Sequence, residues 1–205
     1  MALVKYNNNS ISAITDIADS MKGAMTLIKE QTASASSTID FVDGTSDVVL
    51  DSTYPIYLFK YISVHPSADG AQFTVNFRDG GSSYDATKTT TFFQAQHTEA
   101  DATQFTYETD FDVAQGTGVQ QLVRNIGNGN DESASGELWL FKPSSTTFIK
   151  HFIGRGCTYI SSDKQEDGYA AGYCNVTAAI DGVQFSVNSG NIDAGTFKLY
   201  GIKDS

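Results

Sequence analysis

The side chains that could do chemistry are scattered along this sequence and form no recognisable catalytic set. His65, His97 and His151 lie far apart, and none has a Cys, His or carboxylate partner at metal-ligand spacing. Residues 161–164 read S-x-x-K, the nucleophile motif of penicillin-recognising enzymes, but the companion S-D-N and K-T-G motifs are absent. The sequence also lacks G-x-S-x-G and a phosphate-binding loop. We therefore expect no catalytic residues, no cofactor, no metal site and no enzymatic activity.

Two segments are rich in oxygen atoms that could bind Ca²⁺, which prefers carboxylate and carbonyl ligands. The first contains Asn128, Asn130 and Asp131, and the second spans residues 163–167. Neither has the spacing of a known calcium loop, so solvated turns are favoured. We retain Asn128, Asn130 and Asp131 as candidate surface-contact residues.

Aromatic residues suggest a different kind of contact. Tyr57, Phe59 and Tyr61 form a stripe on one strand face, which could stack on sugars or pack in a core or subunit interface. Packing is the favoured interpretation. Tyr169 and Tyr173, in the glycine-rich segment DGYAAGYC, are expected in a loop and are further candidates for surface contacts.

Near the N-terminus, apolar residues recur on alternating three- and four-residue steps, the a/d pattern of a heptad. Ser10 is a suitable helix cap. The pattern predicts a helix that either forms a coiled coil between copies of the chain or lies across its own β domain. The expected oligomerisation or docking residues are Ile11, Ile14, Ala18, Met21, Met25 and Ile28.

The period changes to two after about residue 38. The polar segment 32–38 reads as a linker, dividing the chain into a helical stem with its linker, residues 1–37, and a β domain, residues 38–205. Alternating segments such as 73–77, 105–113 and 183–187 read as half-buried strands. Turn signals between strands include Asp69-Gly70 and Asp167-Gly168. We predict an all-β fold, an antiparallel, jelly-roll-like β-sandwich with a short N-terminal α-helix.

Composition limits the partners. The net charge of −11 disfavours binding to nucleic acid and to anionic lipid. No stretch has the length of a membrane span and no secretory signal is evident, so no membrane insertion is expected. Cys157 and Cys174 could form a disulfide, but two thiols in a reducing compartment are favoured.

The C-terminal segment GVQFSVNSGNIDAGTFKLYGIK, residues 182–203, resembles the ending of small β-rich virion structural proteins of marine and freshwater tailed bacteriophages. GELWLFKPSSTTFIKHFIG and TIDFVDGTSDVVLDSTYPIYLFKY extend the resemblance over most of residues 38–203. It implies a non-enzymatic virion protein assembled in the host bacterial cytoplasm. The expected role is a homotrimeric capsid decoration or cement protein that contacts itself and the major capsid or tail proteins. The alternative is a tail-fibre or adhesin module that binds host-surface glycan.

Overall fold

The computed structural model describes residues 23–160 and 163–203, and this part of the chain is all-β. Every pairing between its twelve strands is antiparallel. The strands are β1 (Met25–Ser36), β2 (Thr38–Val42), β3 (Ile56–Pro66), β4 (Ala71–Arg78), β5 (Lys88–Thr98), β6 (Thr103–Tyr107), β7 (Gln120–Ile126), β8 (Ala134–Phe141), β9 (Lys150–Ile160), β10 (Lys164–Cys174), β11 (Gly182–Val187) and β12 (Ile192–Ile202).

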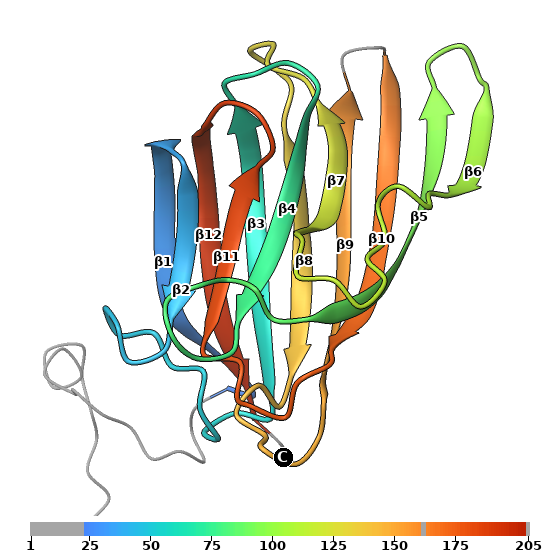
Figure 1. Cartoon of the computed structure of the whole chain (residues 1–205). Helices are drawn as coiled ribbons and strands as arrows, with labels where there is room; N and C mark the ends of the chain where they lie inside the picture. Colours follow the sequence, from blue (N-terminus) through green and yellow to red (C-terminus); the bar gives the residue numbers. More distant parts are fainter. Residues whose placement is uncertain (1–22, 161–162, 204–205) are drawn as a thin grey trace, which may run out of the picture.

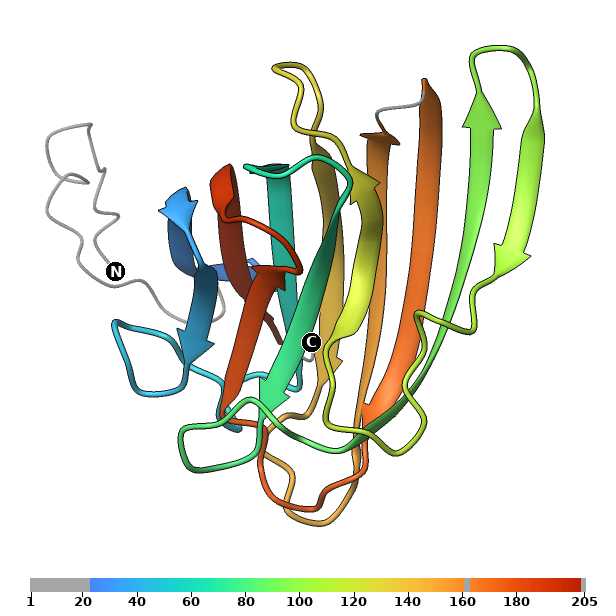
Figure 2. The same ribbon diagram turned by 45° about the horizontal axis from the view of Figure 1, so that its top comes forward.

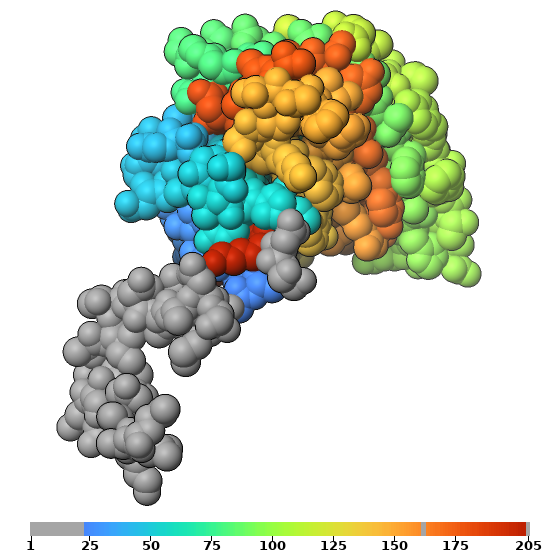
Figure 3. Space-filling model, turned by 90° about the horizontal axis from the view of Figure 1, so that it is seen from below, coloured from blue at the N-terminus to red at the C-terminus, as the bar shows by residue number. Residues whose placement is uncertain are grey.

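The strands form two layers. The larger layer runs in the order β1-β12-β3-β8-β9-β10-β5-β6, and the smaller one runs β7-β4-β11-β2. A single residue pair, Ile126 with Ile160, connects β7 to β9 and so joins the layers. The smaller layer covers the β12, β3, β8 and β9 part of the larger one (Figure 1). β7 is the edge strand of the smaller layer, and Figure 2 shows that the β5–β6 hairpin projects beyond it. Seen from below, β1 and this hairpin lie toward opposite ends of the molecule (Figure 3).

Aromatic side chains fill the space between the layers. The predicted stripe is confirmed as core, because Tyr57, Phe59 and Tyr61 are fully buried. Phe185 on β11 contacts Phe73 across a strand pair with stacked rings 5.7 Å apart, and it reaches Phe59 on the opposite layer. Such rings bury much apolar area and prefer defined mutual orientations. They therefore fix how the two layers sit on each other.

The predicted helix is wrong for residues 25–28, and the predicted linker is wrong up to residue 36. These residues form β1, which pairs with β12 from Met25 opposite Ile202 to Ser36 opposite Ile192. The register shifts between Leu27 and Lys29, and Ile28, which lies at this irregularity, packs against the core. A short apolar run fits a strand as well as a helix, and β12 offers an unpaired edge that a helix would leave open. Ile11, Ile14, Ala18 and Met21 lie outside the described residues.

The predicted strand over residues 105–113 is also shorter than expected. β6 ends at Tyr107, and residues 108–119 cross back to β7 without forming a strand. β6 pairs only with β5, so neither its edge nor its outer face is covered. In the described part of the chain, no helix is long and apolar enough to cross a membrane.

Candidate interaction surface

The outer face of the larger layer, which points away from the core, carries one continuous row of side chains across all eight strands. Cross-strand register aligns these residues in turn. Facing side chains on neighbouring strands lie close enough to interact. The row consists of Glu30, Lys198, Lys60, Glu137, Arg155, Tyr169, Phe93 and Tyr107.

Arg155, Tyr169 and Phe93 form a stack in the middle of this row. The rings of Tyr169 and Phe93 are nearly parallel with centroids 4.9 Å apart, and the Arg155 guanidinium lies 5.0 Å from the Tyr169 centroid. β9 and β5 flank β10 on opposite sides, so the two neighbours cover the two faces of the Tyr169 ring. Asp167 accepts two hydrogen bonds from Arg155, at 3.0 and 2.6 Å, and a third from the Tyr169 hydroxyl. The hydrogen bonds with Asp167 hold the pKa of Arg155 above its ordinary value, so the guanidinium is a fixed cation.

Most exposed apolar side chains gather on this outer face. Of the eight large apolar or aromatic residues exposed in the described part of the chain, strand register places six here. Large exposed apolar patches mark interaction sites, whereas single exposed residues need no explanation. The six are Met25, Leu27, Ile62, Phe105, Tyr107 and Ile153.

The outer face is hollowed at its centre. A depression of about 610 Å³ lies over β3, β8, β9 and β10. Lys60 and Ile62 line one side of it and Gln165 and Asp167 the other. The Lys60 side chain makes no ion pair or hydrogen bond within residues 23–160 and 163–203. Cys157 also lines the depression and its thiol is free and exposed, whereas Cys174 is free and buried.

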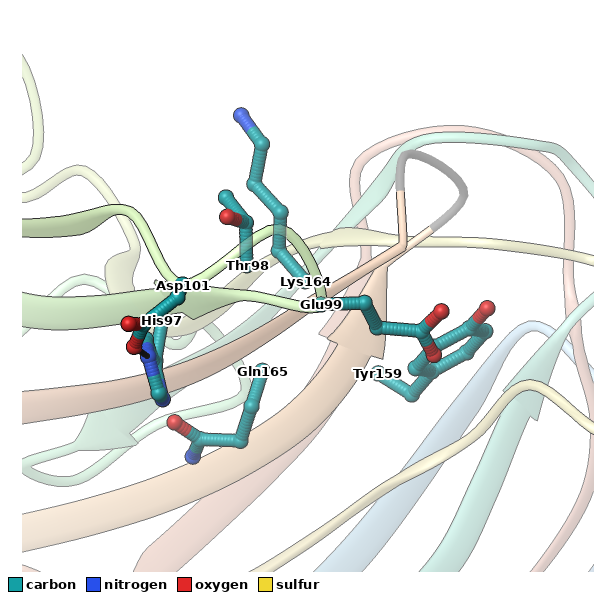
Figure 4. A pocket seen from close by; sticks show the side chains of 7 residues that line it. All are labelled: His97, Thr98, Glu99, Asp101, Tyr159, Lys164 and Gln165. Carbon is teal, nitrogen blue, oxygen red and sulfur yellow. Dashed lines mark hydrogen bonds and ion pairs between the residues drawn. The ribbon is translucent and has the colours of Figure 1, made fainter.

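A second hollow, lined mainly by polar and charged residues, lies where the β5–β6 turn meets the ends of β9 and β10 (Figure 4). His97 and Asp101 point together to one side and are joined by a contact of 3.1 Å. Glu99 and Tyr159 lie beside each other on the other side, and Lys164 points away from both pairs. These side chains converge on no common point (Figure 4). In the described residues, no group of three or more His, Cys, Asp or Glu is placed to hold a metal ion.

The sequence-predicted contact residues fall in two separate places. Asn128, Asn130 and Asp131 are exposed in the β7–β8 turn, which is tied down by Glu132 accepting from the Gly129 N–H at 2.5 Å. The loop predicted for Tyr169 and Tyr173 is wrong, because both lie within β10. Both side chains are half-buried on the outer face, with Tyr173 near His151.

A buried polar network lies on the inner face, where β5 and β10 extend beyond β7. Glu166 is only 1 % exposed, accepts from the Gln96 amide at 2.8 Å and lies 3.7 Å from the Arg124 guanidinium. Arg124 also donates to Glu108 at 3.0 Å. Among the described residues, one Glu166 carboxylate oxygen has no hydrogen-bond partner, and neither has the buried Gln94 side-chain oxygen. Burial outweighs the attraction of Arg124 and raises the pKa of Glu166 to about 7.

Two buried lysines flank Cys174 at the opposite end of the same strands. Lys88 and Lys150 are its two cross-strand neighbours. Lys150 donates to three backbone carbonyls, and Lys88 donates to the Gly118 carbonyl at 2.7 Å. Burial lowers the pKa of Lys88 to about 8 and raises that of Cys174 to about 12. The lysines thus tie down loops, and the thiol stays protonated at neutral pH.

Comparisons with protein-family models, with curated proteins and with solved structures found no match to this chain.

Sequence reasoning missed Phe105, Ile153 and Arg155 as surface residues. The alternation of HFIGRGCTY was the available signal for β9, since His151, Ile153, Arg155 and Cys157 are all exposed while the residues between them are buried. No local sequence pattern marks β6 as an edge strand, so the exposure of Phe105 could not be predicted in the same way.

Proposed function

We propose that this chain is a non-enzymatic structural protein of a tailed-bacteriophage particle, most simply a homotrimeric decoration or cement protein of the capsid. The observation that carries the proposal is the concentration of six exposed apolar side chains on one outer sheet face. A structural protein that packs against copies of itself or against a shell needs such a face. The sequence resemblance described above supports the virion as its place.

We also propose that the two layers form a jelly roll. Its support is the pairing of strands that are distant in sequence, such as β3 with β12 and β4 with β11. The diverging side chains around the polar hollow support a role without catalysis (Figure 4).

Immunogold labelling of intact particles with an antibody to residues 38–205 tests the proposal. Label spread over the head is the expected result for a decoration protein. Label confined to the tail would move the protein to a tail-fibre role, and unlabelled particles would overturn a virion location.

A glycan-binding adhesin is the second candidate, and Phe105 is the observation in its favour. Its ring is 72 % exposed, whereas both faces of the Tyr169 ring are covered. A sugar would therefore stack on Phe105 and not on Tyr169. Glycan-array binding that is lost in Phe105→Ser and retained in Phe148→Ser would support this candidate, since Phe148 is equally exposed at 71 %.

A further inference from the structure

The β5–β6 hairpin, residues 88–107, projects as an arm whose end is poorly covered by the rest of the chain. It stands beyond the edge of the smaller layer (Figure 2). β6 pairs with β5 alone, and Phe105 and Tyr107 on it are exposed. An exposed edge strand with apolar side chains is a liability that native proteins usually cover. A covering partner is therefore expected.

Charge indicates what that partner is. Residues 89–123, which include all of the arm except the buried Lys88, contain five Asp or Glu and no Lys or Arg. Glu99 at the arm's turn has no salt bridge within the described ranges. The outer-face hollow is lined by two basic and two acidic side chains, of which Arg155 and Asp167 pair with each other. On its β3 side, the Lys60 side chain makes no ion pair within the described residues and lies beside the apolar Ile62. The molecule thus carries an acidic, aromatic arm and a hollow with a cation and an apolar wall.

We propose that the arm of one copy docks into the outer-face hollow of a second copy, with Phe105 near Ile62 and Cys157 and Glu99 near Lys60. This inference rests on the proposed self-assembly of the chain and specifies its contact. Phe105 supplies the buried aromatic anchor typical of interface centres. The Glu99–Lys60 pair fixes the register of the contact more than it adds affinity.

The strand register provides a way to test this contact. Phe105, Ala95, Asp167 and Cys157 are successive cross-strand neighbours on four adjacent strands. Three strand spacings separate Phe105 from Cys157 in one copy, about 14 Å. A disulfide needs Cα atoms within about 7 Å. A cysteine at position 105 can therefore reach Cys157 only in another copy.

The experiment oxidises the purified full-length Phe105→Cys chain and identifies the linked peptides by non-reducing gel and mass spectrometry. The expected result is a covalent dimer joined through Cys157, which disappears when Cys157→Ser is added. Phe148→Cys, at an equally exposed site, is the matched control and should give no dimer through Cys157. Because Phe105→Cys also removes the aromatic anchor, the oxidation is run at a protein concentration well above that at which the wild-type chain self-associates. Absence of a link to Cys157 at that concentration, or dimers that persist undiminished with Cys157→Ser, would overturn the proposed contact.

Charge reversal gives a second, independent measurement. Glu99→Lys and Lys60→Glu should each weaken self-association about fivefold in sedimentation experiments, and the double variant should recover most of the loss. Lys142→Glu, at an exposed site outside the hollow, is the control. Single variants that behave like Lys142→Glu would overturn the Glu99–Lys60 pairing.

The rate at which Cys157 is alkylated distinguishes between two possible occupants of the hollow, a second copy of the chain and another part of the same chain. The rate should be fast in dilute protein and fall as the concentration rises. Slow alkylation in a monomer at every concentration would show that another part of the same chain fills the hollow, which overturns the inference. If immunogold labels the particles but Phe105→Cys forms no disulfide with Cys157, the proposed function stands and only this contact is overturned.

Discussion

Gly156 lies where β7 of the smaller layer comes close to β9, in a row with Gly136 and Gly168 across three strands of the larger layer. A Cβ atom on Gly156 would lie 2.4 Å from a Val123 methyl carbon and 2.5 Å from the Tyr61 hydroxyl oxygen. Neither neighbour can withdraw easily, because Tyr61 is fully buried and its hydroxyl donates to the Arg155 carbonyl. The glycine is therefore required by packing and not by a turn.

We predict that Gly156→Ala lowers the free energy of unfolding by about 2–3 kcal/mol, the usual scale of overpacking. Urea denaturation measures it. Gly118→Ala is the matched control, because a Cβ there meets nothing within 4 Å, and its unfolding free energy should stay within about 0.5 kcal/mol of the wild type. Equal stability of the two variants would contradict the close approach of β7 to β9.

Glu166 makes stability depend on pH. Its pKa is raised to about 7 in the folded chain and is close to its ordinary value of about 4.3 when unfolded. Between these values the folded state holds a proton that the unfolded state has lost, so stability falls as pH rises from about 4.5 to 7. The full shift corresponds to roughly 4 kcal/mol.

Glu166→Gln should remove this loss. We predict that the variant gains about 2–3 kcal/mol relative to the wild type on going from pH 5 to pH 8, less than the full shift because part of the loss already occurs below pH 5. Urea denaturation of both proteins at the two pH values measures the difference. Parallel pH profiles would mean that Glu166 does not carry the proton.

Residues 25–36 form the edge strand β1, and hydrogen exchange can distinguish this strand from the helix that the sequence pattern predicts for residues 25–28. β1 pairs with β12 on one side and is the last strand of the larger layer on the other. Amide groups of an edge strand point alternately to the neighbour and to the open edge. We predict a period-two pattern of hydrogen exchange over residues 30–36, with alternate amides protected. Continuous protection, as in a helix where each N–H bonds four residues back, would contradict the pairing.

Local patterns predicted several strands but failed where a distant partner decides. Alternation in residues 73–77 and 183–187 correctly gave strands β4 and β11, and Asp69-Gly70 correctly marked the β3–β4 turn. The half-buried character expected of residues 73–77 is wrong, because Thr74 and Asn76 are buried as well. Asp167-Gly168 gave a false turn, since Gly168 lies inside β10 with its missing Cβ position 2.9 Å from the Phe92 ring. A glycine needed for a turn and one needed for close packing look the same in sequence.

The contact surface was less predictable than the fold for the same reason. Lys60, Cys157 and Phe105 are separated by up to 97 positions, and only strand register brings them onto one face. Their residue types carry no signal of that face. The order of strands in the sheet, which is a property of the whole chain, creates the surface.

For the whole molecule, net charge opposes the assembly that the outer face favours. Each copy carries −11, so two copies repel over the Debye length, which falls from about 30 Å at 0.01 M salt to about 8 Å at 0.15 M. The Glu99–Lys60 attraction is an exposed pair worth at most about 1 kcal/mol. Repulsion between whole copies therefore outweighs this single pair, and apolar contacts carry the affinity.

We predict that self-association of the full-length chain tightens several-fold when NaCl is raised from about 10 to about 150 mM, because salt screens the repulsion and leaves apolar burial intact. Sedimentation velocity over a concentration series measures it. Phe105→Ser should weaken association at both salt concentrations while keeping the same direction of salt dependence, since it removes apolar contact and no charge. Association that weakens with salt would mean that complementary charges, and not the apolar outer face, hold the copies together.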